Sequence, residues 1–230
     1  MLPLLIYQLI KTVLAEKWFK SKSQAVKIHV SRHMITAVIL AVIMLLISCT
    51  VFAQDITLTY KVMQGDNEIG WLRLQRKDSC STTFITCESE VKKRMIVMFS
   101  VKEKQEAIFS NGIMMQSHVY RKVNNDVKVN IYTQNQGNHY VINKTKSSEQ
   151  VMINGIRDNQ VSIYFTEPVN INQMYSDSYQ RLLEIKDIGN HAYKISFPGG
   201  DTNNYYYTNG ICTKVKLNHS LFSAEFILTK

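Results

Sequence analysis

From Asp55 onward, apolar and polar residues alternate along the chain, and long stretches with the spacing of an amphipathic helix are absent. The alternation is clear at residues 127–131 and again at residues 193–197. Successive side chains of a strand point to opposite faces of a sheet. Each of these segments therefore predicts a β-strand with one buried face.

Asn-Gly pairs predict three reverse turns, at residues 111–112, 154–155 and 209–210. This dipeptide is typical of tight hairpins, because both positions tolerate a positive φ. The segments between turns predict an all-β domain of about ten to twelve antiparallel strands. A sheet of that size must curl to protect its edges, so we expect a curved antiparallel sheet or an open half-barrel.

A different pattern lies upstream, where twelve of the thirteen residues of segment 35–47 are apolar. The run suits the core of a signal peptide and is shorter than the roughly 20 residues that a spanning helix needs. The chain therefore divides into a leader extension (1–33), a hydrophobic helix with a cleavage region (34–54) and one β-rich domain (55–230). Membrane contact is expected through the amino-terminal segment only.

Three fates are open for this segment. Val51 and Ala53 are small residues at the third and first positions before Gln54, and this pattern predicts cleavage by signal peptidase after Ala53. The residues LISC also fit a lipobox with a lipid on Cys49, and an uncleaved anchor is the third alternative. The apolar TVFA after Cys49 favours cleavage and an exported protein of the periplasm or cell envelope. The long extension also fits a translation start at Val26.

The formal charge of +9 is shared unequally along the chain. Residues 1–54 contain six basic residues and one acidic residue, and the remainder contains 21 basic and 17 acidic residues. Proteins that bind nucleic acid usually concentrate basic residues on one face. The mild excess in the β-rich domain does not predict a nucleic-acid partner.

The β-rich domain contains three cysteines, so at most one disulfide can form within it. Cys80 and Cys87 are the pair that a short hairpin would bring together in an oxidising compartment. The alternative is that these two residues and Cys212 are free thiols that pack as small apolar side chains.

Residues that carry chemistry do not cluster in the sequence. The histidines after residue 100 lack HxH or HxxxH spacing, and no CxxC pair occurs, so no metal site is predicted. No Gly-rich phosphate loop or GxSxG pattern is present, so no cofactor is expected. Glu167 and Asp177 are the acidic pair considered for hydrolysis, and their spacing does not favour that role.

A resemblance to a known family is carried by four segments: YKVMQGDNEIGWLRLQRKD, FSNGIMMQS, VSIYFTEPVNINQMYSDSYQR and FPGGDTNNYYYTNGICTKVKL. Together they resemble an uncharacterised family of small exported β-proteins from Gram-negative bacteria, classed as a domain of unknown function. The motif positions are Gly70, Glu167, Pro168, Tyr205, Tyr207, Asn209 and Gly210. The resemblance implies a curved sheet similar to those of periplasmic lipid and lipoprotein carriers, and it implies no catalytic residues.

Some of these positions have an expected structural role. Gly70 and Gly210 are expected in turns, where glycine adopts a positive φ without strain. Pro168 holds Glu167 extended, and the carboxylate can then cap a loop or meet a basic side chain.

The leading hypothesis is a non-enzymatic envelope protein whose concave face binds an apolar or amphipathic ligand, such as a lipid, or another envelope protein. Its many methionines and aromatic residues suit an adaptable apolar cavity, although they also suit a plain core. A structural or protein-interaction module without a small ligand is the first alternative. An unrecognised hydrolase is the second.

Overall fold

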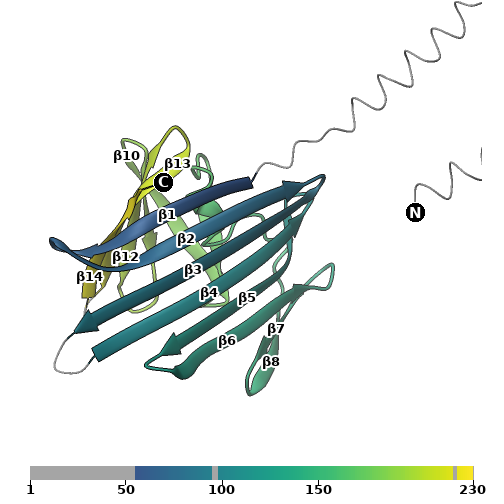
Figure 1. Cartoon of the computed structure of the whole chain (residues 1–230). Coiled ribbons are helices and arrows are strands. Elements are labelled where there is room, and N and C mark those ends of the chain that lie inside the picture. The colour runs from purple at the N-terminus through teal and green to yellow at the C-terminus, as the bar shows by residue number, and fades with distance from the viewer. Residues whose placement is uncertain (1–54, 95–97, 220–221, 230) are drawn as a thin grey trace, which may run out of the picture. The chain divides into compact units, whose positions relative to one another are not determined.

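The computed structural model describes residues 55–94, 98–219 and 222–229, so Cys49, Ala53 and Gln54 of the leader lie outside the described part. The described residues form one sheet of fourteen strands (Figure 1). None of their helices is long and apolar enough to cross a membrane. The strands are β1 (Asp55–Gln64), β2 (Asn67–Ser79), β3 (Thr82–Arg94), β4 (Met98–Ser110), β5 (Ile113–Val123), β6 (Asp126–Asn135), β7 (Tyr140–Lys144), β8 (Ser147–Val151), β9 (Gln173–Ser176), β10 (Arg181–Gly189), β11 (Ala192–Ser196), β12 (Thr202–Thr208), β13 (Ile211–His219) and β14 (Phe222–Leu228).

The sheet consists of two meanders that meet at the first strand. Its spatial order is β8-β7-β6-β5-β4-β3-β2-β1-β14-β13-β12-β11-β10-β9. β1 pairs with β2 on one side and with β14 on the other, and both pairs are antiparallel. The first and last strands therefore join the two halves, while β8 and β9 form the outer edges of an open sheet.

Three short strands explain why the sheet exceeds the predicted ten to twelve. β7 and β8 have five residues each, and β9 has four. The sequence of β8, SSEQV, is almost entirely polar and exposed, so no apolar alternation marks it. The all-β class and the large antiparallel sheet are confirmed, and the strand count is corrected to fourteen.

Two of the three predicted Asn-Gly turns are hairpin turns. Residues 111–112 connect β4 to β5 and residues 209–210 connect β12 to β13, all with φ between 50° and 78°. Residues 154–155 lie instead between β8 and β9, where Gly155 has a φ of 61°. The expected turn role of Gly210 is confirmed.

Gly70 is not in a turn, which corrects the expectation for this residue. It lies inside β2, opposite Val62 of β1 and Val91 of β3, beside a β-bulge between Val62 and Met63. A Cβ atom at this position would lie 2.2 Å from the carbonyl oxygen of Glu90 and 2.8 Å from the Cα of Val91. Glycine is required here because two backbones approach closely.

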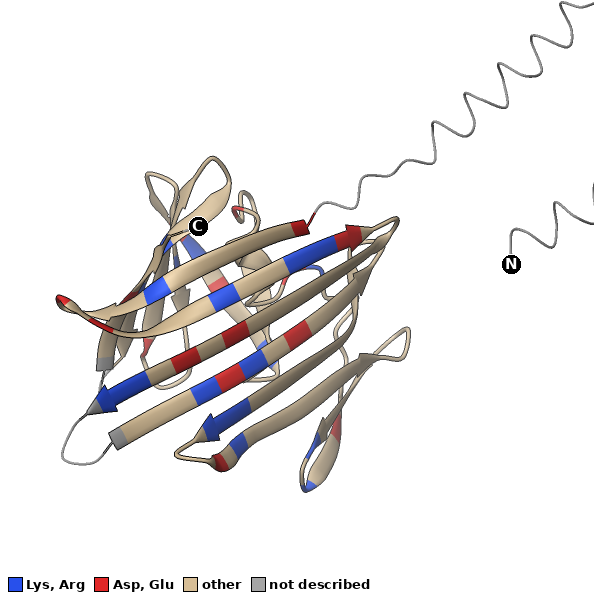
Figure 2. Cartoon of the chain, viewed as in Figure 1, with Lys and Arg blue, Asp and Glu red and all other residues tan. Residues whose placement is uncertain are grey.

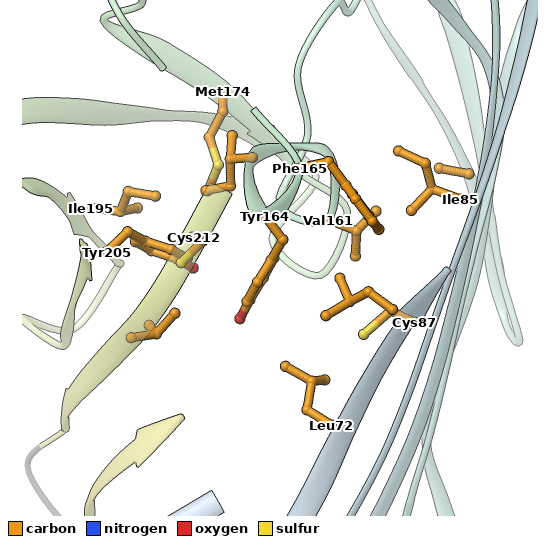
Figure 3. Packing of buried hydrophobic residues seen from close by; sticks show 14 of the residues in the cluster. Leu72, Ile85, Cys87, Val161, Tyr164, Phe165, Met174, Ile195, Tyr205 and Cys212 are labelled. Carbon is orange, nitrogen blue, oxygen red and sulfur yellow. The ribbon is translucent and has the colours of Figure 1, made fainter. Parts of the chain in front are cut away.

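The segment of residues 152–172 between β8 and β9, here called the crossover segment, packs against the sheet and completes the core. It contains the short 3-10 helix η1 (Ser162–Tyr164). Figure 3 shows its side chains between residues of β2 and β3 on one side and residues of β11, β12 and β13 on the other. Its buried apolar residues are Ile156, Val161, Ile163, Tyr164 and Phe165.

Two tyrosines of the sheet anchor the crossover segment through buried hydrogen bonds. The Tyr140 hydroxyl accepts the Ile156 N–H at 3.0 Å and donates to the Met114 carbonyl at 2.9 Å. The Tyr207 hydroxyl donates to the Ile163 carbonyl at 2.8 Å. These bonds satisfy buried backbone groups of an irregular segment, so they fix its position against the sheet.

Candidate functional site

A cavity of about 490 Å³ lies between the sheet and the crossover segment. Its volume lies within the range of ligand sites, roughly 300–1,000 Å³. One part of its lining is apolar: Leu72, Cys87, Val161, Tyr164, Leu217 and Phe226. The other part is polar: Glu103, Gln105, Arg121, Ser178, Asn203 and His219. The cavity is therefore amphipathic, with its apolar floor formed by β2, β3, β13, β14 and the crossover segment.

One ion pair belongs to the polar part of the lining. Arg121 of β5 and Glu103 of β4 are cross-strand neighbours, and the Arg121 Nε donates to the Glu103 carboxylate. Their side chains are 34% and 22% exposed, so both remain accessible. The Nη2 atom of Arg121 lies 3.5 Å from the Ser178 hydroxyl. Since a guanidinium has five N–H donors, some remain available to a ligand.

Aromatic rings lie between this ion pair and a second polar group. The Tyr179 side chain is 40% exposed, and its ring centroid lies 5.7 Å from that of Phe197. The Phe197 ring lies 6.3 Å from the ring of His219, whose Nε2 lies 3.0 Å from the Asn203 Oδ1. This wall combines aromatic surface with hydrogen-bonding groups, which suits a ligand with apolar and polar parts.

A buried carboxylate supports the polar part of the cavity. Asp177, directly after β9, accepts hydrogen bonds from Gln105 at 2.7 Å, from Asn159 at 3.0 Å and from the Ser117 hydroxyl. Burial raises the pKa of Asp177 to about 6, although these hydrogen bonds oppose the shift. Because Gln105 also lines the cavity, the network links the crossover residue Asn159 to the cavity wall.

Glu167 belongs to a separate network. Its carboxylate accepts a hydrogen bond from the Tyr193 hydroxyl at 2.9 Å and lies 2.9 Å from the Nδ1 of His191. Its N–H donates to the Gly210 carbonyl at 3.0 Å. The expected contact with a basic side chain is confirmed. Glu167 and Asp177 share no hydrogen-bond partner among the described residues, so the structure does not assemble the acidic pair considered for hydrolysis.

The predicted Cys80–Cys87 disulfide is wrong, because the described cysteines are free thiols. Cys80 is exposed in the turn between β2 and β3, whereas Cys87 is buried within β3, opposite Leu74. The extended strand from Thr82 to Cys87 spans roughly 16 Å. A disulfide requires Cα atoms about 4.4–6.8 Å apart, so this hairpin cannot bring the two residues together.

We expect a brief reaction of the native protein with N-ethylmaleimide to modify Cys80 and to spare Cys87 and Cys212. Burial raises the pKa of the Cys87 thiol and raises that of Cys212 to about 12, so neither forms a thiolate at neutral pH. Peptide mapping by mass spectrometry measures each site, and labelling in urea serves as the control. Equal labelling of the three sites in the native protein would contradict their different burial.

Sequence reasoning assigned methionines to an apolar cavity, but within the described part of the chain no methionine lines it. Met114 and Met174 are buried in the core, whereas Met115 and Met152 are exposed. The motif residues Tyr205 and Tyr207 are buried core residues of β12. Among the described residues, no group of three or more His, Cys, Asp or Glu side chains is placed to hold a metal ion.

Sequence reasoning missed Glu103, Gln105 and Arg121, although a signal was present for two of them. In β4, residues 103 and 105 share the face of Ala107 and Phe109, because side chains alternate along a strand. Ala107 and Phe109 are buried. Polar residues that continue an inward apolar face therefore indicated a polar region on the concave side.

Residues 60–229, most of the chain, match the family described as "Domain of unknown function (DUF6134)". The chain belongs to the DUF6134 family. This confirms that the resemblance noted in the sequence leads to a family of unknown function. A comparison with curated proteins finds no match to the chain.

The DUF6134 domain also resembles a solved structure, the beta-barrel-like protein of DUF1849 from Brucella abortus. The TM-score is 0.51, and the alignment covers 77% of this chain and 96% of that chain. The two sequences are 10% identical, so the likeness concerns the fold alone. The beta-barrel-like neighbour agrees with the open sheet of this domain.

The longest strands of the DUF6134 domain carry charges of both signs. Figure 2 shows acidic and basic residues along β2, β3 and β4, and basic residues at the end of β5. Lys102 lies 3.3 Å from Glu90 on the neighbouring strand, and Lys104 lies 2.8 Å from Glu106 on the same strand. Exposed pairs of this kind add little stability but keep a sheet surface soluble. The cavity is therefore better supported as a binding site than this charged surface.

Proposed function

We propose that the DUF6134 domain is a non-enzymatic binding protein of the cell envelope that holds an apolar or amphipathic ligand in its cavity. The observation that carries the proposal is the cavity of about 490 Å³ beside a crossover segment that is otherwise closely packed. The space is partly open to solvent, so a ligand can reach it. A concave site of this volume with an apolar floor and grouped polar residues is typical of a ligand site. The location in the envelope is supported by the leader pattern of residues 35–54.

The floor of the cavity is held in place before a ligand enters. The ring of Tyr164 makes edge-to-face contacts with Tyr60 at 5.5 Å and with Tyr205 at 5.7 Å. Tyr60 is itself fixed, because its hydroxyl donates to the Cys212 carbonyl at 2.6 Å. A rigid apolar surface loses little conformational entropy on binding, so it favours affinity for an apolar group.

The proposal predicts that the neutral fluorophore N-phenyl-1-naphthylamine binds the domain with a Kd on the order of micromolar. Ser89 lines the cavity from β3, so a Ser89→Trp substitution should fill part of it and weaken binding at least about tenfold. Fluorescence titration measures both affinities. The matched control is Glu88→Trp, which places the same ring on the exposed face of β3 and should bind as the wild type does.

A wild type that gives no fluorescence increase would contradict the proposal. Equal weakening by the two tryptophan variants would also contradict it, since binding would not depend on the cavity. Native mass spectrometry of protein purified from its own envelope adds an independent measurement, with a co-purifying lipid-sized mass as the expected result.

A protein-interaction module is the second candidate, and the convex face over β3–β6 favours it. Phe84 and Tyr132 are 42% and 47% exposed beside a groove of about 440 Å³. His118 stacks on Tyr132 with ring centroids 3.8 Å apart, so that ring is held in place. Exposed aromatic residues are enriched at protein interfaces. Failure of the probe to bind, with crosslinking to one protein through Tyr132, would favour this candidate.

A further inference from the structure

The lining of the cavity contains one acidic and one strongly basic side chain. Among the described residues that line it, these are Glu103 and Arg121. His219 also lines it, but its Nδ1 lies 3.5 Å from the Asp201 carboxylate, so a protonated ring has its own counter-ion. The charges of the lining side chains therefore balance before a ligand enters, and the Asp177 carboxylate lies behind the lining, where Gln105 donates to it at 2.7 Å.

This balance restricts the head group of an amphipathic ligand. An anionic head group would place a second negative charge beside Glu103, and a cationic one would place a second positive charge beside Arg121. An unpaired charge in a partly buried site is strongly unfavourable. A head group with both signs opposes each lining charge and leaves the net charge of the site unchanged.

Two kinds of group beside the ion pair can contact a ligand: the N–H donors of Arg121 and the aromatic rings of Tyr179 and Phe197. The Nε of Arg121 is occupied by Glu103, whereas the hydrogen-bond partner of its Nη2 among the described residues is the Ser178 hydroxyl, at 3.5 Å. Guanidinium groups bind phosphate or carboxylate through such N–H donors. The neighbouring Tyr179 and Phe197 add aromatic surface to the same lining, and aromatic faces attract ammonium groups.

We infer that the ligand is a single-chain amphiphile with a zwitterionic head group. Its phosphate or carboxylate binds Arg121, and its ammonium lies near Glu103 and the rings of Tyr179 and Phe197. Its apolar chain lies on the apolar floor of the cavity. The inference rests on the proposed function, because it names the class of ligand that the same cavity holds.

The test compares three amphiphiles with the same dodecyl chain, each below its micelle concentration: dodecylphosphocholine, dodecyl phosphate and dodecyltrimethylammonium. Each is titrated against the purified protein loaded with N-phenyl-1-naphthylamine. We expect dodecylphosphocholine to displace the probe at a concentration about tenfold lower than either of the other two amphiphiles, because their head groups carry charge of one sign only and unbalance the site.

Two variants should shift this preference in opposite directions. Glu103→Gln leaves Arg121 uncompensated, so dodecyl phosphate should become the strongest competitor. Arg121→Gln leaves Glu103 uncompensated, so dodecyltrimethylammonium should become the strongest. The controls Glu106→Gln and Lys122→Gln change charges on the opposite face of β4 and β5 and should keep the wild-type order.

The outcomes separate the inference from the proposed function. If the probe binds but the wild type and both cavity variants give the same order of competitors, the head-group inference is overturned and the binding function stands. If the probe does not bind the wild type, both are overturned. Probe binding by each variant shows that it is folded, so a change of order then reports the head group.

Discussion

Replacing Gly70 by alanine is expected to lower the free energy of unfolding by about 3 kcal/mol. The added Cβ would lie 2.2 Å from the carbonyl oxygen of Glu90 and 2.8 Å from the Cα of Val91. Both atoms belong to the backbone of β3, which pairs with β2 on one side and β4 on the other. Relief therefore requires that two central strands move apart, and denaturation in urea followed by circular dichroism measures the cost.

The control for this prediction is Gly65→Ala, in the turn between β1 and β2. Gly65 has a φ of 58°, and a Cβ there would meet nothing within 4 Å. Its replacement should cost about 1 kcal/mol through the left-handed backbone alone. A Gly70→Ala variant as stable as Gly65→Ala would contradict the close approach of β2 and β3.

Gly70 also shows what a single sequence leaves open about this fold. A glycine a few residues after a predicted turn suits a second turn and suits a close backbone contact equally well. Strand pairing decides between them, and pairing joins residues far apart in the chain. The alternation at 127–131 and 193–197 is local, and it correctly predicted β6 and β11 as strands. The predicted buried face fails at the start of β6, where Val127 is 50% exposed. β8 and β9 are held by pairing partners rather than by their own pattern, so they were missed.

The site was less predictable than the fold, because its residues meet only through long-range packing. Asp177 attracted attention as a partner of Glu167, yet its partners are Gln105, Ser117 and Asn159. The first two lie 72 and 60 residues away in the sequence. Whether a polar inward residue faces a cavity depends on how much of the sheet the crossover segment covers, and local alternation carries no information about that.

Asp177 is expected to stabilise the domain as the pH falls from neutral to mildly acidic. Burial raises its pKa to about 6 in the folded protein, above the ordinary value of 3.8 that applies after unfolding. A carboxyl that binds its proton more tightly in the folded state adds stability as the pH falls through about 6. The free energy of unfolding rises by about 2 kcal/mol from about pH 7.5 to about pH 4.5 through this carboxyl, and the same amount is lost when the pH is raised again.

The Asp177 carboxylate can bind this proton without losing a hydrogen-bond partner. Gln105 and Asn159 donate to Oδ2, whereas the Ser117 hydroxyl donates to Oδ1. A proton on Oδ1 can be donated to the Ser117 oxygen, because a hydroxyl rotates and also accepts. An Asp177→Asn variant reproduces that arrangement, with its amide oxygen at Oδ2 and its NH₂ toward Ser117, and it does not titrate.

Urea denaturation of the wild type and Asp177→Asn at the two pH values therefore isolates the titration of this carboxyl. The difference between their free energies of unfolding should change by about 2 kcal/mol in favour of the wild type at the acidic pH. A difference that does not vary with pH would contradict the raised pKa. Asp177→Ala, which leaves the Gln105 and Asn159 donors without an acceptor, should be about 3 kcal/mol less stable than Asp177→Asn at both pH values, because neither variant titrates at this position. Because Gln105 lines the cavity, that variant should also bind N-phenyl-1-naphthylamine more weakly than Asp177→Asn does.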